Sequence, residues 1–395
     1  MKSGWQTKKL GEVCKVIVGQ SPEGKFYNKE GKGHPFYQGK KEFGEKYIAL
    51  PTTWTTQTKK IAIKNDILIS VRAPVGPINY STGDICIGRG LGAIRCSCAI
   101  ESDFLFYFLL SIQDRIAGRD GAVFASINKN DIESFLLPLP PLPEQHRIVA
   151  ILNEAFKCIA TAKANAKKNL KNARELFESY LHSIFSQRGE GWVEKRLGDI
   201  AKTQYGLSEP MNEEGKGFKI FRMGEIQNGR LIDTGLMKFA NIDRVEFEKY
   251  KLQPGDILFN RTNSFELVGK TGIFDMPGSY CFASYLVRLL LNKKVVLPEF
   301  LNYFMNSKQF QNTVKQKASK SINQSNINAT ILSNEPVRFP ESLKEQKTIV
   351  TCLDSLRAET KHLESLYQKK LLALDELKQS LLNQAFTGQL SESIP

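Results

Sequence analysis

Two glycine-containing segments carry residue types that could bind phosphate groups. Val268-Gly269-Lys270-Thr271 resembles the end of a P-loop, in which a glycine-rich backbone surrounds phosphates beside a lysine. A P-loop also needs a glycine five positions before Gly269, and Ser264 stands there. The segment 88–92 (Gly-Arg-Gly-Leu-Gly) resembles a dinucleotide-binding loop, but the third glycine is not at the required spacing. Neither segment therefore predicts nucleotide binding.

Other catalytic and metal-binding patterns are equally incomplete. The seven cysteines include no C-x-x-C, and Cys96-Ser-Cys98 has neither zinc-finger spacing nor a nearby histidine. The four histidines have no matching nucleophile. The chain also lacks an Asn-Pro-Pro-aromatic or Asp-Pro-Pro-aromatic stretch for methylating a base amine. We therefore expect no catalytic, cofactor-binding or metal site in this chain, and reduced, mostly buried thiols.

Charge and hydropathy indicate the kind of partner. The 395 residues carry a formal net charge of +14, and 41% of them are hydrophobic, enough for buried cores. A strongly basic protein favours a polyanionic partner, with nucleic acid first. The N-terminus has no signal-peptide core, and the longest apolar run, Phe104 to Leu110, is too short to cross a bilayer. The sequence thus predicts a cytoplasmic protein without a membrane partner.

The chain repeats itself. "GWQTKKLGEVCKVIVGQSP" from Gly4 is echoed by "GWVEKRLGDIAKTQYGLSEP" from Gly191, 187 residues later. The offset grows to 190 for "NDILIS" and "GDILFN", and to 195 if the two "SIN" words at Ser126 and Ser321 are matched. From Glu144 onward it is constant at 201 residues. The sequence therefore predicts a tandem duplication whose first part varies in loop length and whose second part tolerates no insertion.

The constant part has the pattern of a long helix. Its apolar positions follow steps of four and three, a narrow stripe typical of a coiled coil. Pro143 suits the first turn of one helix, and Ser342 with Glu345 forms a capping box for the other. Each helix is ~43 residues, or about 65 Å long. Because one helix cannot bury such a stripe alone, we predict that the two helices pair as an antiparallel coiled coil. The stripe in the first copy comprises Ile148, Leu152, Ala155, Ile159, Ala162, Ala166, Leu170, Ala173, Phe177, Tyr180 and Ile184.

The remaining halves combine strands and helices. "IAIKNDILISV" and "YKLQPGDILFN" place a turn before a β-rich run, and "ESDFLFYFLLSIQDRI" and "LPEFLNYFMNSKQFQN" predict amphipathic helices with core aromatic stripes. The predicted fold is α/β (α+β), with a globular domain and a long helix occurring twice. The predicted boundaries are 1–141 (first domain), 142–188 (central helix), 189–340 (second domain), 341–390 (C-terminal helix) and 391–395 (tail).

Two similar basic domains related by a pseudo-two-fold match the local symmetry of DNA, and diverged loops predict different sequence preferences. The chain resembles the specificity subunits of type I restriction–modification systems over essentially its whole length. The resemblance rests on "GWVEKRLGDI", "FRMGEIQNGRLI", "GDILFNRTNSFELVGKTGIF", "ASYLVRL", "SINQSNI", "PLPPLPEQHRIVAIL" and "LDELKQSLLNQAFTGQL", which occur in this order. The first copy departs from this pattern at "FYQGKKEFG" and at 71–74, which are variable-domain positions.

The resemblance implies a non-catalytic DNA-recognition subunit. Each globular half is then a target recognition domain that reads one half of a bipartite, asymmetric site in double-stranded DNA. The helices set the spacer and dock two modification subunits, which bind S-adenosylmethionine and methylate adenine. Restriction (translocase) subunits bring ATP and Mg, so the cofactors belong to the partners and not to this chain. The half-site sequences, the spacer length, the presence of a restriction subunit and the oligomeric state stay open.

Base-reading residues are expected in the loops that differ between the copies, because Arg and Lys pair with guanine, and Asn and Gln with adenine, in the major groove. The alternative is that many are turn formers or caps. The candidates are Gln20, Ser21, Tyr37, Gln38, Arg72, Arg89, Ser126 and Asn128 in the first copy, and Ser208, Arg222, Asn260, Arg261, Asn263, Ser284, Ser321, Asn323 and Gln324 in the second.

Two other functions are compatible with the composition. One is a basic coiled-coil adaptor that binds nucleic acid or protein outside restriction–modification. The other is a self-contained methyltransferase. A duplex-binding screen with and without modification subunits separates them, because the specificity subunit alone should methylate nothing.

Overall fold

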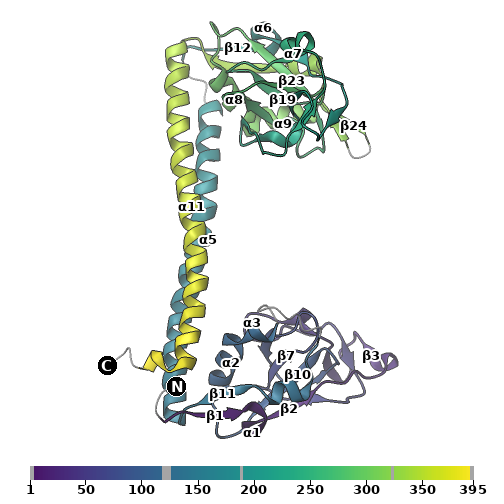
Figure 1. Ribbon diagram of the computed structural model, residues 1–395, viewed down its shortest axis with the longest axis vertical. Helices are drawn as coiled ribbons and strands as arrows, with labels where there is room; N and C mark the ends of the chain where they lie inside the picture. The colour runs from purple at the N-terminus through teal and green to yellow at the C-terminus, as the bar shows by residue number, and fades with distance from the viewer. Residues whose placement is uncertain (1–3, 118–125, 187–189, 322–323, 392–395) are drawn as a thin grey trace. The chain divides into compact units, whose positions relative to one another are not determined.

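The computed structural model describes residues 4–117, 126–186, 190–321 and 324–391. The chain divides into two compact units. Unit 1 comprises residues 1–167 and 368–395, and unit 2 comprises residues 168–367. Each unit contains one globular domain, here domain 1 and domain 2, and a section of both long helices (Figure 1).

The two long helices have 45 residues each and are α5 (Leu142–Ser186) and α11 (Leu343–Thr387). In unit 1, Lys163 of α5 forms an ion pair with Asp375 of α11. In unit 2, Arg174 Nε lies 3.0 Å from Glu364 Oε2. Phe156 lies next to Lys378 in unit 1, and Tyr180 next to Cys352 in unit 2, so within each unit the partner number falls as the α5 number rises and the helix sections run antiparallel (Figure 1). The predicted antiparallel pairing is confirmed.

The helix stripe is buried as predicted through most of α5, where Ile148, Leu152 and Ala166 are at most 2% exposed. The last steps differ from the prediction. Leu181 and Phe185 are buried, whereas Tyr180 is 37% exposed. The stripe drifts by one position because this end of α5 packs into the core of domain 2 as well as against α11.

Each domain core takes up one end of both helices. The core of domain 1 includes Ile148 and Leu152 of α5 together with Leu382 and Ala385 of α11. The core of domain 2 includes Leu181 and Phe185 of α5 and, from α11, Val350 and Leu353. Domain 1 therefore folds against residues of α11 more than 200 positions away in the chain, and domain 2 folds against the end of α5 as well as against its own helix α11.

Domain 1 is built on a four-stranded antiparallel sheet with a five-stranded sheet beside it. The first has the order β2 (Cys14–Val18), β10 (Leu91–Cys96), β7 (Ile67–Ser70), β8 (Ile78–Tyr80). The second has the order β3 (Tyr27–Asn28), β5 (Trp54–Thr55), β4 (His34–Tyr37), β9 (Ile85–Ile87), β6 (Ile61–Ala62). A further pair joins β1 (Gln6–Lys9) to β11 (Leu136–Leu139), and α1 (Leu10–Val13) links β1 to β2.

Domain 2 repeats this plan, with six strands in place of four in the first sheet and four in place of five in the second. The larger has the order β13 (Ala201–Tyr205), β23 (Leu286–Leu291), β19 (Ile257–Asn260), β21 (Thr271–Ile273), β17 (Arg230–Leu231), β16 (Ile226–Gln227). A four-stranded sheet has the order β14 (Met211–Asn212), β18 (Lys238–Ala240), β15 (Phe218–Phe221), β22 (Tyr280–Phe282). A three-stranded sheet has the order β20 (Thr262–Asn263), β25 (Gln324–Asn326), β24 (Ser319–Ser321). A two-stranded sheet pairs β12 (Trp192–Arg196) with β26 (Pro336–Pro340). The short helices α6 (Leu197–Ile200) and α7 (Arg244–Tyr250) complete this part.

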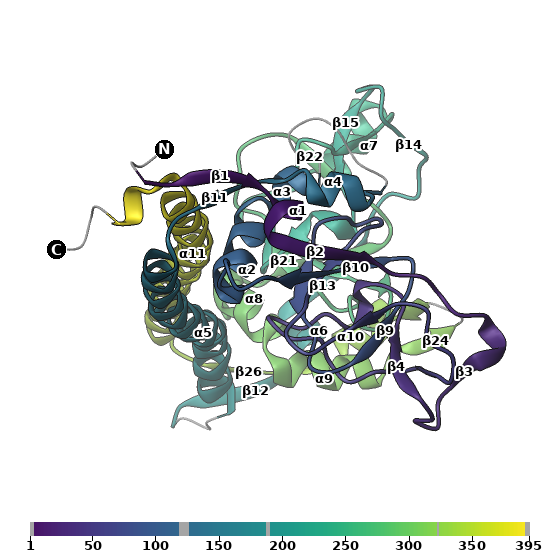
Figure 2. The same ribbon diagram turned by 90° about the horizontal axis from the view of Figure 1, so that it is seen from below.

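The predicted amphipathic helices lie between their own sheet and the long helices (Figures 1 and 2). Each is broken in two, as α2 (Ser102–Ser111) and α3 (Gln113–Ile116) in domain 1 and as α8 (Pro298–Asn306) and α9 (Lys308–Gln316) in domain 2. The aromatic residues Phe104 of α2 and Phe300 of α8 are fully buried. The stripes are therefore core, as expected.

One glutamine in each copy joins the long helix to its domain. Gln145 Nε2 donates to the carbonyls of Ala99 and Pro140, at 3.2 and 2.9 Å, and its Oε1 accepts from Glu101 N–H at 2.8 Å. Gln346 makes the same three kinds of bond, with the backbone of residues 295, 340 and 297. Both side chains are buried. This shared contact accounts for the glutamine in the matching Glu-Gln segments of the two repeats.

Candidate nucleic-acid interface

Three loops meet in each domain, one after a strand of the sheet that contains β2 or β13 and two after parallel strands of the neighbouring sheet. We call them the three-loop edge, residues 19–21, 38–39 and 88–90 in domain 1 and 206–208, 222–224 and 283–285 in domain 2. They follow β2, β4 and β9 in domain 1, and β13, β15 and β22 in domain 2. Because β4 pairs in parallel with β9, and β15 with β22, their carboxyl ends face the same side. The loops are thus brought together by strand pairing.

The same backbone hydrogen bonds hold the three-loop edge in both domains. Gln20 N–H donates to Ile87 O at 2.9 Å, and Leu207 N–H to Phe282 O at 2.9 Å. Glycine is required at the start of the first loop. A Cβ on Gly19 would lie 2.2 Å from the nearest carbonyl oxygen, and one on Gly206 would lie 2.4 Å from it.

In domain 1 the structure brings together four predicted residues. Ser21 Oγ donates to Gln38 Oε1 at 2.8 Å and accepts from Arg89 N–H at 3.2 Å. The side chains of Gln20, Gln38 and Arg89 are exposed, and Ser21 is half-buried. The edge of domain 1 therefore presents two amides and one guanidinium to solvent, with one amide oriented by a hydroxyl.

In domain 2 the corresponding predicted residues are Ser208, Arg222 and Ser284. Arg222 Nη2 donates to Glu225 Oε1 at 2.7 Å, and its backbone N–H donates to Oε2 at 2.8 Å. Glu225 is 3% exposed, so a buried carboxylate fixes the guanidinium. Ser208 and Arg222 line a hollow of about 720 Å³ together with Lys238 and others. Ser284 N–H donates to the carbonyl of residue 207.

Arg261 lies beside this edge, since its N–H donates to Tyr285 O at 3.0 Å. Its guanidinium carbon lies 4.8 Å from the centre of the Tyr205 ring. Tyr205 in turn accepts from Ala329 N–H through its hydroxyl at 3.0 Å. Arg261 is half-buried, and its guanidinium is held in place by this cation–π contact with the Tyr205 ring.

Two predicted base contacts are buried. Tyr37 is 2% exposed, its hydroxyl donates to Ala49 O at 2.8 Å, and burial raises its pKa to about 12. Asn260 is 0% exposed and its amide donates to Leu267 O at 3.2 Å. Both face inward from strand ends, so they are assigned to structural support and not to the exposed surface expected of them. Asn263 is half-buried and its amide donates to Met223 Sδ at 3.1 Å.

The two "SIN" words are not equivalent. Ile127 N–H donates to Val71 O at 3.0 Å, and Ile327 N–H donates to Arg261 O at 2.9 Å. Ser126-Ile127-Asn128 therefore corresponds to 326–328, an offset of 200, and the match to Ser321 at 195 is wrong. A three-residue match inside a loop region cannot specify register, whereas strand pairing does.

Asn128 is a helix cap. Its Oδ1 accepts from Asn130 N–H at 2.8 Å and from Asp131 N–H at 3.2 Å, at the start of α4 (Lys129–Glu133). Asn328 caps α10 (Ala329–Ser333) in the same way through Ile331 N–H. The cap explains Asn128 without DNA.

The other candidates lie near the strand ends. Arg72 and Ser126 are exposed and form an isolated antiparallel bridge. Gln324 is exposed in β25, which pairs with β20 and β24. Asn323 and the side chain of Ser321 lie outside the described residues.

Sequence reasoning missed residues that the structure places at the edge. Tyr285 is 41% exposed and lines the hollow of domain 2 with Lys238. Glu225 holds Arg222. Tyr285 adjoins the predicted Ser284 and stands where the first copy has Gly90, so a strand-based alignment of the repeats would have found it. Glu225 stands three residues after Arg222, at the spacing of a capping box, which could have indicated it; nothing local distinguishes Lys238.

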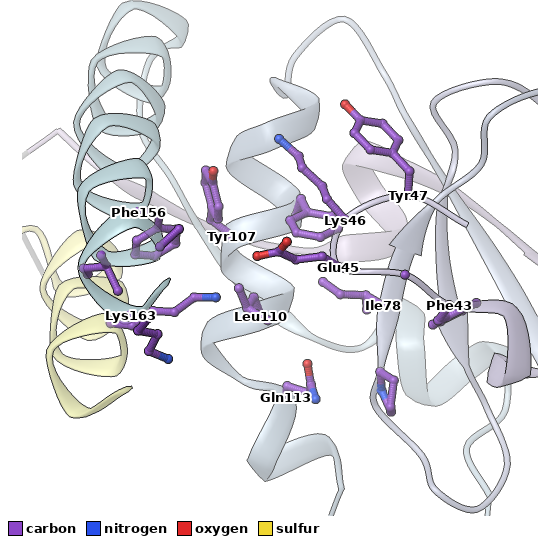
Figure 3. A pocket seen from close by; sticks show the side chains of 16 residues that line it. Phe43, Glu45, Lys46, Tyr47, Ile78, Tyr107, Leu110, Gln113, Phe156 and Lys163 are labelled. Atoms are coloured by element: carbon purple, nitrogen blue, oxygen red, sulfur yellow. The ribbon is translucent and has the colours of Figure 1, made fainter. Parts of the chain in front are cut away.

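A larger hollow of about 770 Å³ lies in unit 1 between domain 1 and the helices (Figure 3). Lys46, Tyr107, Phe156 and Lys163 line it. Lys46 Nζ lies 2.9 Å from Asp103 Oδ1, and Lys163 is paired with the α11 aspartate. Lys46 and Lys163 are neutralised internally and Lys378 Nζ lies 5.1 Å from the centre of the Phe156 ring, so this hollow is a seam where the domain docks on its helices.

The phosphate-binding look-alikes have other roles. Val268 to Thr271 runs directly into β21, and residues 88–92 run into β10, so neither precedes the helix N-terminus that phosphate binding uses. Within the described ranges, no group of three or more His, Cys, Asp or Glu is placed to hold a metal ion. No helix in that part of the chain has the length and apolarity needed to cross a membrane.

Comparison with known proteins agrees with this geometry. The family model "Type I restriction modification DNA specificity domain" matches residues 2–172 and 189–372. The putative type I restriction enzyme MjaX specificity subunit of Methanocaldococcus jannaschii is 42% identical over 175 residues, or 43% of this chain and 41% of that protein. The match with MjaX thus spans less than half of that relative. The EcoKI specificity subunit of Escherichia coli is 26% identical over 373 residues, or 87% of this chain and 78% of that subunit.

Two solved structures share the fold at 21% identity. One, from work on complex assembly and conformational transition of the type I R-M system, has a TM-score of 0.80 and a coverage of 99% of both chains. The HsdS subunit of Thermoanaerobacter tengcongensis has a TM-score of 0.64, covering 99% of this chain and 98% of its own. The family model and the two related specificity subunits favour the resemblance over the adaptor and the methyltransferase considered above.

Proposed function

The chain belongs to the type I restriction–modification DNA specificity family, the non-catalytic DNA-recognition component of these systems, and from this premise we propose that each of its domains reads one half of a bipartite DNA site. The two half-sites differ in sequence, and double-stranded DNA is bound in the major groove. Because recognition requires access to cellular DNA, the proposal also places the protein in the cytoplasm.

One observation carries the proposal. The three-loop edge has corresponding strand pairing and loop contacts in both domains, and two of its positions carry different polar residues. Domain 1 has Gln38 and Arg89 where domain 2 has Arg222 and Ser284. The exposed Gln20 is replaced by the buried Leu207, and a serine is kept at 21 and 208. A scaffold that is kept while its polar side chains change is what two readers of different base sequences require.

The long helices act as the ruler and the docking surface. We propose that they bind two modification subunits, which supply S-adenosylmethionine and methylate adenine, and that restriction subunits supply ATP-driven translocation with Mg. Ion pairs between α5 and α11 in both units keep the helices in register, which suits a fixed spacer.

Selection from a randomised duplex library tests the recognition step. The chain assembled with its modification subunits should enrich two short, different half-sites separated by a constant gap, and the chain alone should methylate nothing. Enrichment without a bipartite pattern would contradict the proposal, and so would methylation by the isolated chain.

A length change tests the ruler. Four residues inserted after Ala166, with four more after Leu371 to keep the antiparallel register, add about 6 Å, or one helical turn. The expected result is a gap longer by one or two base pairs with both half-sites unchanged. Altered half-site bases would contradict the ruler, and methylome sequencing distinguishes the two outcomes.

A further inference from the structure

Gln38 and Arg222 occupy the same position in the two domains. Gln38 follows β4, whose Tyr37 pairs with Ile87 of β9, and Arg222 follows β15, whose last residue pairs with Phe282 of β22. The residue after the second strand is also equivalent, and it is Gly88 in domain 1 and Ala283 in domain 2. Two neighbouring positions therefore differ together between the domains.

Steric fit links the two differences. A Cβ on Gly88 would lie 2.5 Å from Gln38 Oε1, so the amide occupies the space that an alanine methyl would need. Domain 2 has that methyl at Ala283, and its Arg222 is turned toward Glu225 instead. The pairs Gln38–Gly88 and Arg222–Ala283 are thus two alternative packings of one site.

Each packing presents a different hydrogen-bonding edge. In domain 1, the Ser21 hydroxyl holds Gln38 Oε1, which keeps a second lone pair, and both Nε2 protons are available. In domain 2, Glu225 takes one proton of Arg222 Nη2 and the other Nη protons stay available as a fork. An amide edge fits the N6 and N7 atoms of adenine, and an arginine fork fits the O6 and N7 atoms of guanine.

Resting on the proposed function, we propose that Gln38 with Gly88 and Arg222 with Ala283 set one base pair in each half-site, adenine for domain 1 and guanine for domain 2. Ser21 and Glu225 are positioning residues, since they hold the reading group without contacting the base. The buried carboxylate holds the guanidinium before DNA arrives, so little conformational entropy is lost on binding.

The test converts the domain 2 site into the domain 1 type. The variant combines Arg222→Gln and Ala283→Gly with Glu225→Gln, which avoids an unpaired buried carboxylate. Ser208 already stands where domain 1 has Ser21. The complex with modification subunits is selected against duplexes randomised in both half-sites. Guanine should give way to adenine at a single position of the domain 2 half-site, with about tenfold or greater discrimination.

A matched control uses Lys238→Gln, which removes a cation from the same hollow and frees Glu213, its partner at 3.0 Å. This control should lower affinity for all sequences and change no base. If the triple variant does not fold, Gln38→Ala tests the other domain, because Gln38 is exposed and should lose adenine preference at one position only.

Three results would overturn the inference. The first is an unchanged guanine preference in a folded triple variant, and the second is an unchanged adenine preference in Gln38→Ala. The third is a loss of base preference over a whole half-site together with a lower melting temperature, because that pattern identifies a side chain that only stabilises the loop. Failure of the proposed function gives a different result, because in that case the complex without any substitution selects no bipartite duplex.

Discussion

Domain 1 and domain 2 differ most where their backbones are most alike. At the three-loop edge several backbone hydrogen bonds recur, such as Gln20 N–H to Ile87 O and Leu207 N–H to Phe282 O, yet an oriented amide in one domain is replaced by a clamped arginine in the other. Away from this edge the two domains share side chains as well, as Gln145 and Gln346 show. The comparison teaches that the residues that stabilise the fold and the residues proposed to recognise DNA can vary separately. The contacts that dock each domain on the helices are kept, whereas the outward residues of the loops vary.

A second difference lies inside the sheets. The turn before β7 and the turn before β19 each place one aspartate, Asp66 or Asp256, whose carboxylate accepts a backbone N–H of the turn. Asp66 is paired with Arg95, which is 32% exposed, whereas Asp256 is paired with Arg288, which is 8% exposed. The same local turn is therefore neutralised from the surface in domain 1 and from the interior in domain 2.

The largest expected effect concerns these arginines. Arg288→Ala leaves Asp256 buried without its counter-charge and should reduce the free energy of unfolding by about 3–5 kcal/mol. Arg95→Ala should cost less, about 1.5–3 kcal/mol, because water can reach Asp66 in its place. Denaturant unfolding with hydrogen exchange on each domain measures both. Arg338→Ala, which removes a surface ion pair with Glu194, is the control and should cost at most about 1 kcal/mol. An equal loss in the free energy of unfolding for Arg95→Ala and Arg288→Ala would show that the two aspartates are not neutralised differently.

The helix-docking glutamines should behave identically. Gln145→Ala and Gln346→Ala each remove three hydrogen bonds and leave buried backbone groups unpaired, at a cost of about 2–3 kcal/mol in the free energy of unfolding. Gln368→Ala, exposed on α11, is the matched control and should be silent. Loss of stability in only one of the two variants would show that the domains do not dock alike. The same unfolding assay decides it.

The glycines of the first loop come next. Gly19→Ala and Gly206→Ala force a Cβ against carbonyl oxygens and should cost about 1–3 kcal/mol in the free energy of unfolding. Each should also weaken selection of its own half-site only, which duplex selection with the assembled complex measures. Gly24→Ala and Gly224→Ala meet no atom within 4 Å and serve as controls. If the control variants lose as much free energy of unfolding, crowding of the added Cβ at the three-loop edge does not cause the loss of stability.

The smallest effect belongs to the caps. Asn128→Ala and Asn328→Ala should each lower the free energy of unfolding by about 1 kcal/mol, and serine at either position should restore most of it. Thermal melting checks this. A loss of DNA affinity by Asn128→Ala at unchanged melting temperature would instead return Asn128 to the base contacts first predicted for it.

By itself the sequence determined the duplication, the two long helices and the strand–helix content of the domains. These features depend on periodicity and on local turn and cap signals, which act within a few residues and survive in any context. The N-cap half of the predicted capping box at Ser342 illustrates this, since Glu345 N–H donates to Ser342 Oγ at 3.5 Å. The antiparallel pairing followed from the length of an apolar stripe that one helix cannot bury.

Only the tertiary structure decided which polar residues face outward. Tyr37 and Asn260 stand at strand ends like Gln38 and Arg261, and nothing in their spacing reveals that they point into the core. The pairing of 126–128 with 326–328 likewise depends on strand register, which folding sets. Side-chain direction at the end of a strand is set by what packs on the other face, and that neighbour is distant in the sequence.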